Sequence, residues 1–154
     1  MLSYGQRRLC TLATVISGTY KYQIDSKGRV RIPARFKEVL GRDLLIGYGA
    51  GEYLVVYNQD MINKIVERYS GVEVYDGDLY DSVREMSENL FPFECDNQDR
   101  YQIPVALRES VGLKGEIYFV GVLNKLEIWS EENYAKRKDK SVSQSRLGSF
   151  TGLK

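Results

Sequence analysis

An internal duplication is the feature that most constrains how this chain can fold. A shift of 71 positions, without any gap, superimposes segment 18–41 on the segment that ends at Gly112. Solenoid repeats have shorter periods, of about 20–50 residues. The sequence therefore predicts two copies of one small domain. The identical pairs are Asp25 and Asp96, Arg29 and Arg100, Ile32 and Ile103, Pro33 and Pro104, Glu38 and Glu109, and Gly41 and Gly112.

The first copy has the pattern of short strands and helices. Apolar and polar residues alternate over 20–24, as in a half-buried strand. Residues 25–28 suit a tight turn, because Asp25 can bond its downstream backbone and Gly28 accepts a positive φ. Pro33 suits the first position of a helix and Gly41 suits its end. The other predicted elements are strands at 29–32, 44–48 and 53–57 and a helix with Ile62, Ile65, Val66 and Tyr69 on one face.

The second copy predicts the same order of elements. It has strands near Phe93 and Tyr101, a short helix from Pro104, strands at 116–120 and 125–129, and a last helix capped by Ser130. Between the copies, Leu79, Val83, Met86 and Leu90 predict a connecting helix. The fold class is therefore mainly β with short helices. We expect an extension at 1–17, a first unit at 18–69, a connecting segment at 70–90, a second unit at 91–139 and a flexible, Ser-rich tail at 140–154.

The composition argues against several functional classes. The chain has no histidine, the commonest general base and metal ligand. Cys10 and Cys95 lack the spacing of a zinc site, and we expect free thiols in a reducing cytosol. No apolar run approaches the roughly 20 residues of a membrane span, and no phosphate loop or nucleophile motif occurs. We therefore expect no catalytic site, metal, cofactor, small-molecule substrate or membrane partner.

The near-neutral net charge of +1 hides an uneven distribution. Segment 21–37 has six basic residues against one acidic residue, Asp25, and therefore carries +5. The matching segment 93–109 carries −2, from two basic and four acidic residues, and 70–90 carries −5, from one and six. DNA is a polyanion, so a DNA-binding protein concentrates cations on one surface. The first hairpin is the candidate for that surface.

Arg29 is the main candidate for DNA recognition. A two-stranded ribbon fits the major groove, where arginine can bond guanine O6 and N7, whereas Lys27 at the turn tip suits phosphate. The alternative is that Arg29 only pairs with Asp25, although Asp25 could also hold Arg29 ready to dock. The flanking candidates are Lys21, Arg31 and Arg35, with Arg100 in the second copy. The residues expected to shape the turns are Asp25, Gly28, Pro33, Asp96, Asp99 and Pro104.

The turn sequences carry a resemblance to a known family. Segment 25–29, Asp-Ser-Lys-Gly-Arg, followed by Ile32-Pro33, resembles the D-x-x-G-R-x-x-x-P signature of MraZ proteins. The signature recurs weakly at 96–100 with Pro104, and 120–129 resembles the second-copy hairpin of that family. The resemblance covers roughly Gly18 to Arg137, and its tandem arrangement is more specific than either copy alone.

The resemblance implies both a fold and a function. It implies an AbrB-like β-barrel of swapped hairpins in each copy, with the copies in a pseudo-twofold arrangement. It further implies a homo-oligomer, possibly ring-like, that regulates transcription by binding double-stranded DNA. The implied target is a set of direct repeats in the promoter of its own division and cell-wall operon, which would place the protein in the cytoplasm, on the nucleoid.

The chain departs from the family at two places. Asp99 replaces the turn glycine of the second copy, and we expect it to adopt the left-handed conformation at a cost of roughly 1 kcal/mol. Seventeen residues precede Gly18, where the family has about three. We therefore expect natural translation to begin at Val15. The alternative is a genuine extension, with Arg7 and Arg8 on DNA or with 9–16 as an edge strand.

Two other functional classes stay open at this point. AbrB-like folds also occur in antitoxins, and the C-terminal tail could neutralise a partner protein as an antitoxin arm does. Antitoxins typically carry one copy of the fold, whereas this chain carries two. An enzyme would need acidic pairs such as Asp96 and Asp99 to act in catalysis or bind a metal, but acids on a turn are expected to be solvated.

Overall fold

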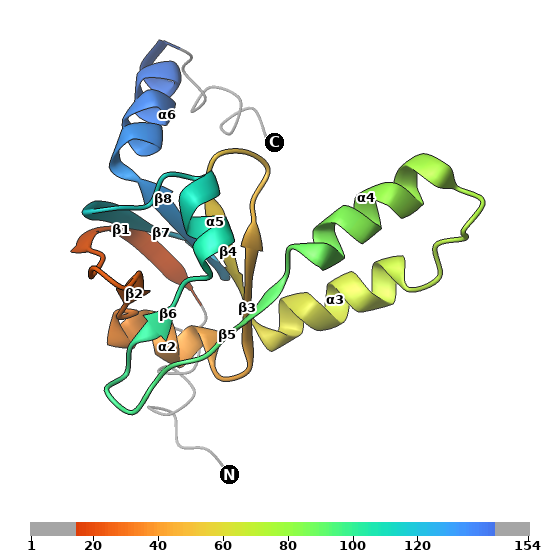
Figure 1. The fold of residues 1–154 in the computed structure, drawn as a ribbon, viewed down its shortest axis with the longest axis horizontal. Coiled ribbons are helices and arrows are strands. Elements are labelled where there is room, and N and C mark those ends of the chain that lie inside the picture. The colour runs from red at the N-terminus through yellow and green to blue at the C-terminus, as the bar shows by residue number, and fades with distance from the viewer. Residues whose placement is uncertain (1–14, 144–154) are drawn as a thin grey trace, which may run out of the picture.

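The computed structural model describes residues 15–143 (Figure 1). Cys10, the residues 1–14 that would precede a start at Val15, and segment 144–154 lie outside this range. The strands are β1 (Ile16–Gln23), β2 (Arg29–Val30), β3 (Leu44–Tyr48), β4 (Leu54–Tyr57), β5 (Phe91–Phe93), β6 (Tyr101–Gln102), β7 (Glu116–Leu123) and β8 (Lys125–Ser130). The helices are α2 (Ala34–Leu40), α3 (Gln59–Tyr69), α4 (Gly77–Glu88), α5 (Val105–Ser110) and α6 (Glu131–Ser143).

The two copies of the duplicated unit share their sheets. The six-stranded antiparallel sheet has the order β1-β7-β8-β4-β3-β5, and β2 pairs with β6 in a second sheet. Because β1 to β4 belong to the first copy, its strands pair across the copies as β1 with β7, β4 with β8 and β3 with β5. Figure 1 shows this mixing, with red β1 beside blue-green β7. The predicted fold class, mainly β with short helices in two tandem units, is confirmed. The closed barrel and the unit boundaries stay predictions.

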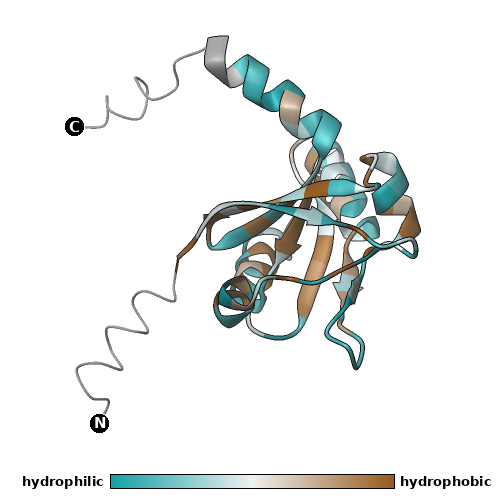
Figure 2. Cartoon of the chain, turned by 90° about the vertical axis from the view of Figure 1, so that its left-hand side faces the viewer, coloured by the Kyte–Doolittle hydropathy of each residue, from teal (hydrophilic) through white to brown (hydrophobic). Residues whose placement is uncertain are grey.

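The apolar core lies where the shared sheets meet α2 and α5. Phe36, Phe93 and Phe119 are among its largest fully buried side chains, and they come from α2, β5 and β7. The Tyr20 ring packs edge-on against Phe36, with ring centroids 5.1 Å apart. Figure 2 shows hydrophobic residues gathered on the strands, whereas α6 is mostly hydrophilic. Burial of aromatic side chains from both copies joins them into one core.

The predicted turn and helix signals place most elements to within a few residues. Pro33 and Pro104 precede their helices instead of occupying the first position, with ψ of 138° at both. That ψ is extended, so each proline is the residue that precedes its helix, and the helix begins one residue later. Gly41 ends α2 with φ of 74°, as predicted. Helix α6 continues to Ser143 and so extends into segment 140–154, whose flexibility stays a prediction.

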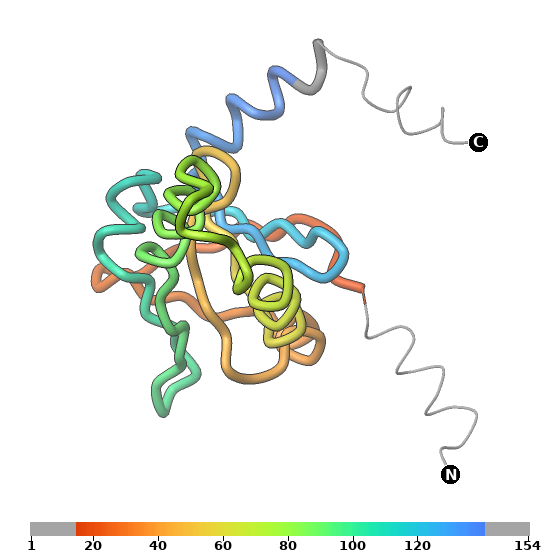
Figure 3. The backbone as a smooth tube through the Cα atoms, turned by 90° about the vertical axis from the view of Figure 1, so that its right-hand side faces the viewer, coloured from red at the N-terminus to blue at the C-terminus, as the bar shows by residue number. Residues whose placement is uncertain are grey.

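Helices α3 and α4 form a hairpin that projects from the sheets, and Figure 3 looks along it from its tip. Asn58 caps α3, because its Oδ1 accepts a hydrogen bond of 2.9 Å from the Met61 backbone amide. The predicted connecting helix is present as α4. Within residues 15–143, no helix is long and apolar enough to cross a membrane.

Candidate nucleic-acid interface

The turn between β1 and β2 is organised by one carboxylate. Asp25 Oδ1 accepts hydrogen bonds from the backbone amides of Lys27 and Arg29, at 2.9 and 2.8 Å. Asp25 Oδ2 accepts a third, at 2.7 Å, from Arg29 Nε. Gly28 has φ of 78°, and its amide donates to the Asp25 carbonyl at 3.0 Å. The sequence Asp-Ser-Lys-Gly-Arg thus closes a turn that fixes the arginine side chain.

The turn before β6 has the same geometry. Asp96 accepts hydrogen bonds from the amides of Gln98 and Arg100, at 2.8 and 3.0 Å, and from Arg100 Nε at 2.8 Å. Asp99 has φ of 62°, so the predicted left-handed conformation is confirmed. Asp enters this region more readily than most residues, which explains why the turn keeps its shape without a glycine.

Both turn aspartates are held in the charged form. Hydrogen bonds from the Arg29 amide, with the Arg29 side chain and the Lys27 amide, lower the pKa of Asp25 below its ordinary value. The Arg100 amide, followed by the Gln98 amide and the Arg100 side chain, lowers the pKa of Asp96 in the same way. A carboxylate that accepts several donors within its own turn is already satisfied, so its charge repels phosphate less than an unpaired one would.

The lowered pKa values predict how the turns respond to acid. A carboxylate whose pKa is lowered by folding stabilises the fold fully when the pH is above its unfolded-state pKa of about 3.9. This stabilisation is lost as the pH falls through the lower pKa of the folded state. At pH 7, Asp25→Asn combined with Asp96→Asn should therefore melt at a lower temperature than the parent protein. The gap should close as the pH is lowered from about 5 to about 2. A melting gap that stays constant across this pH range would contradict the assignment.

The ion pair between Asp25 and Arg29, which was the alternative to a DNA-binding role, is present. It engages only Nε of the guanidinium, and within residues 15–143 the two terminal nitrogens of Arg29 make no hydrogen bond. The side chain of Arg29 is 22% exposed and that of Arg100 is 26% exposed. The geometry is therefore compatible with both roles, because the ion pair fixes the rotamer and leaves donors for a ligand.

The other candidate cations lie in different surroundings. Lys27 at the turn tip and Arg31 after β2 are exposed, and neither makes an ion pair within the described range. Lys21 on β1 forms an ion pair of 2.9 Å with Glu116 on β7, which raises the pKa of Lys21. Arg35 donates a hydrogen bond of 3.0 Å to the Ser17 carbonyl and lies over the Tyr20 ring. Lys21 and Arg35 thus have intramolecular partners, whereas Lys27 and Arg31 are available.

Two further basic residues lie at the turns, and sequence reasoning gave them no role. Lys37 on α2 forms an ion pair with Asp99 of the second turn. Arg108 on α5 lies against Gly28 of the first turn. The duplication aligns Lys37 with Arg108 and Gly28 with Asp99, so each copy sends a basic side chain to the turn of the other. That alignment was the available signal, but it does not show which turn each side chain reaches.

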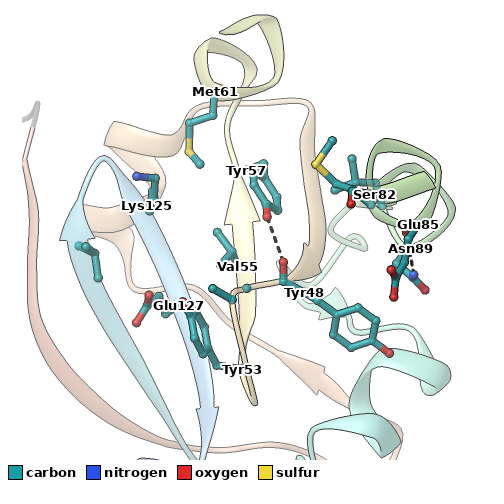
Figure 4. Close-up of a pocket in the computed structure, with 15 residues that line it drawn as sticks. Tyr48, Tyr53, Val55, Tyr57, Met61, Ser82, Glu85, Asn89, Lys125 and Glu127 are labelled. Carbon is teal, nitrogen blue, oxygen red and sulfur yellow. Dashed lines mark hydrogen bonds between the residues drawn. The ribbon is translucent and has the colours of Figure 1, made fainter. Parts of the chain in front are cut away.

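A separate cavity of about 570 Å³ lies between the sheet and α4 (Figure 4). It is lined by aromatic and sulfur-containing side chains, and the Tyr57 hydroxyl donates to the Tyr48 carbonyl at 3.1 Å. Burial raises the pKa of Tyr57, so its hydroxyl stays protonated near neutral pH. Lys125 and Glu127 line one side of the cavity.

Among the described residues, no group of three or more acidic or cysteine side chains could hold a metal ion. Cys95 is exposed and free.

Comparison with known proteins agrees with the duplicated architecture. The family model described as "MraZ protein, putative antitoxin-like" matches twice, over residues 15–78 and 86–148. A protein of Caldanaerobacter subterraneus subsp. tengcongensis named transcriptional regulator MraZ is 35% identical over 133 residues, which is 84% of this chain and 93% of its own length.

Two other relatives carry the same name. The protein of Alkaliphilus metalliredigens is 33% identical over 124 residues, or 80% of this chain and 87% of the relative. The protein of Thermomicrobium roseum is 34% identical over 122 residues, or 79% and 86%. The two family matches follow the same duplication that interleaves β1–β4 with β5–β8. The chain therefore belongs to the MraZ family.

Proposed function

We propose that this protein is a DNA-binding transcriptional regulator whose first turn, residues 25–29, contacts DNA. The observation that carries the proposal is the geometry of Arg29, whose Nε is fixed by Asp25 while its terminal nitrogens stay available. The relatives are named transcriptional regulators, which is not a class of enzyme. The first turn also belongs to the most basic segment of the chain, 21–37, with a charge of +5 from six basic residues and one acidic residue.

The basic residues differ in their proposed roles. Arg29 reads a base edge or a phosphate, because a guanidinium can make two parallel hydrogen bonds to guanine or to phosphate. Lys27 at the tip binds phosphate as a point charge, and Arg31 binds the flanking backbone. Lys21 and Arg35 contribute to the positive field and would have to exchange their intramolecular partners to touch DNA. Arg100 contributes less, because its turn also carries Asp99.

We further propose that the protein acts as a homo-oligomer, ring-like in form, on direct repeats in the promoter of its own division and cell-wall operon. It would then reside on the nucleoid. Direct repeats are matched by subunits related head to tail, as in a ring. The hairpin of α3 and α4 supports such an assembly, because it projects from the sheets and exposes Val66, Tyr75 and Leu79. An apolar groove of about 260 Å³ runs between its helices.

The test is an electrophoretic shift with the DNA upstream of the protein's own gene, followed by footprinting of the shifted complex. The purified full-length chain should bind without any partner protein, and its footprint should cover repeated sites. Light scattering of the same sample should give a mass several times 17.7 kDa. The mass of a monomer, at the protein concentration of that sample, would contradict the proposed oligomer.

Salt dependence measures how many phosphates are bound. Each neutralised phosphate contributes about −0.9 to the slope of log affinity against log salt. Because Lys27, Arg29 and Arg31 would meet phosphates in several subunits, the slope should be steeper than about −3. Affinity is measured at increasing potassium chloride on one promoter fragment. A slope near zero would refute phosphate binding and favour the second candidate, an antitoxin-like module that binds a protein.

A further inference from the structure

We propose that the phosphate-binding site at the first turn is completed by Arg108 from the second copy, whereas the equivalent site at the second turn is closed by Asp99, which holds Lys37. This inference rests on the proposed DNA-binding function and deepens it. Each chain would then present one competent DNA-binding turn although it carries two copies of the motif.

The Arg108 side chain occupies the space beside Gly28 where another residue would have its Cβ atom. A Cβ atom added at Gly28 would lie 1.7 Å from Arg108 Nη1 and 2.3 Å from Arg108 Cζ. The guanidinium of Arg108 therefore rests against the backbone of the turn. Gly28 leaves space for this contact, and it also accepts the positive φ of the turn, at 78°.

The second copy also holds the first turn through its backbone and a side chain. The Ile103 amide donates to the Gly28 carbonyl at 3.0 Å, and Gln102 Nε2 donates to the Lys27 carbonyl at 2.8 Å. These two contacts fix the turn relative to β6 and α5. Arg108 and the turn are thus positioned by the same part of the second copy.

Arg108 has the chemistry of a phosphate ligand. It is half-buried, and nowhere in 15–143 does its guanidinium form an ion pair or a hydrogen bond. It lines a cavity of about 640 Å³ beside the first turn, together with Ser26, Lys114 and the carboxylates of Asp25 and Glu109. Asp25 is occupied by the donors of its own turn. A planar fork of donors with no protein acceptor is suited to bind a phosphate oxygen pair.

The second turn shows the opposite arrangement at equivalent positions. Lys37 occupies the place of Arg108, and Asp99 occupies the place of Gly28. Lys37 Nζ pairs with Asp99 Oδ1, and this contact raises the pKa of Lys37. The equivalent cavity, of about 530 Å³, is lined by Lys37, Arg42 and the acidic residues Asp43 and Glu94. The cation is neutralised there, and the turn carries the additional negative charge of Asp99.

The test compares equivalent substitutions in the two copies of the full-length chain on the same promoter DNA. Arg108→Gln should weaken binding by about tenfold or more and make the salt slope shallower by about one for each DNA-bound subunit. Lys37→Gln, its matched control, should change affinity by less than about twofold, because Asp99 already neutralises Lys37. Thermal melts establish that each variant is folded.

A second pair of variants tests the closed site independently of Arg108. Asp99→Asn should strengthen binding by about threefold to tenfold, because asparagine tolerates the positive φ and releases Lys37. Adding Lys37→Gln to Asp99→Asn should remove that gain. The inference would be overturned if Asp99→Asn strengthened binding equally with and without Lys37. It would also be overturned if folded Arg108→Gln bound DNA as well as the unsubstituted protein. In both cases the proposed function would stand. If the unsubstituted protein does not bind promoter DNA, the proposed function fails and the inference fails with it.

Discussion

Arg29→Ala is expected to weaken binding to promoter DNA by about tenfold to a hundredfold, or 1–3 kcal/mol, while the protein stays folded. The side chain is not part of the apolar core, and within residues 15–143 it pairs only with Asp25 of the same turn. An exposed or half-exposed ion pair contributes little to the free energy of unfolding. The loss should therefore occur in binding. Affinity is measured by electrophoretic shift, and folding by thermal melt.

Arg100→Ala is the matched control, because Arg100 makes the same contacts with Asp96 that Arg29 makes with Asp25. It should weaken binding less, since Asp99 adds a negative charge beside it. Equal losses for the two variants would show that both turns dock in the same way. Unchanged affinity in a folded Arg29→Ala protein would show that Arg29 does not contribute to DNA binding.

Phe119→Ala is expected to lower the free energy of unfolding by about 3–5 kcal/mol, the largest effect on stability that we predict. Phe119 on β7 is fully buried, and its ring lies 5.6 Å from that of Tyr22 on β1. β7 lies between β1 of the first copy and β8 of the second. The cavity left by the substitution would thus weaken both copies together, and unfolding should remain one cooperative transition.

Chemical denaturation followed by two probes measures this effect. The single tryptophan, Trp129, reports on the second copy, and circular dichroism reports on the whole chain. Both signals should shift together to lower denaturant at one fixed protein concentration, since an oligomer's stability depends on concentration. Val122→Ala on the same strand, where Val122 is 37% exposed, should change the free energy by about 0.5 kcal/mol or less. Two separate transitions would contradict a shared core.

Asp99 illustrates how a residue can be predicted correctly in one respect and incompletely in another. Its left-handed backbone was expected from the aligned turns and is present. Its ion pair with Lys37 was not expected, because the two residues are far apart in sequence and belong to different copies. From the sequence alone, Asp99→Gly should leave binding unchanged or strengthen it. The structure adds a reason, since the substitution also releases the lysine.

The sequence by itself determined the duplication, the order of strands, turns and helices, and the two aspartate-centred turns. These features depend on residues close together in the chain, such as Asp25 and Arg29, or on comparing the chain with itself. Only the tertiary structure decided that β1 pairs with β7, that Lys37 reaches Asp99 and that Arg108 rests on Gly28. Alternation of apolar residues fixes which face of a strand is buried but not which strand lies beside it. That choice follows from the packing of one core by both copies, which no local pattern encodes.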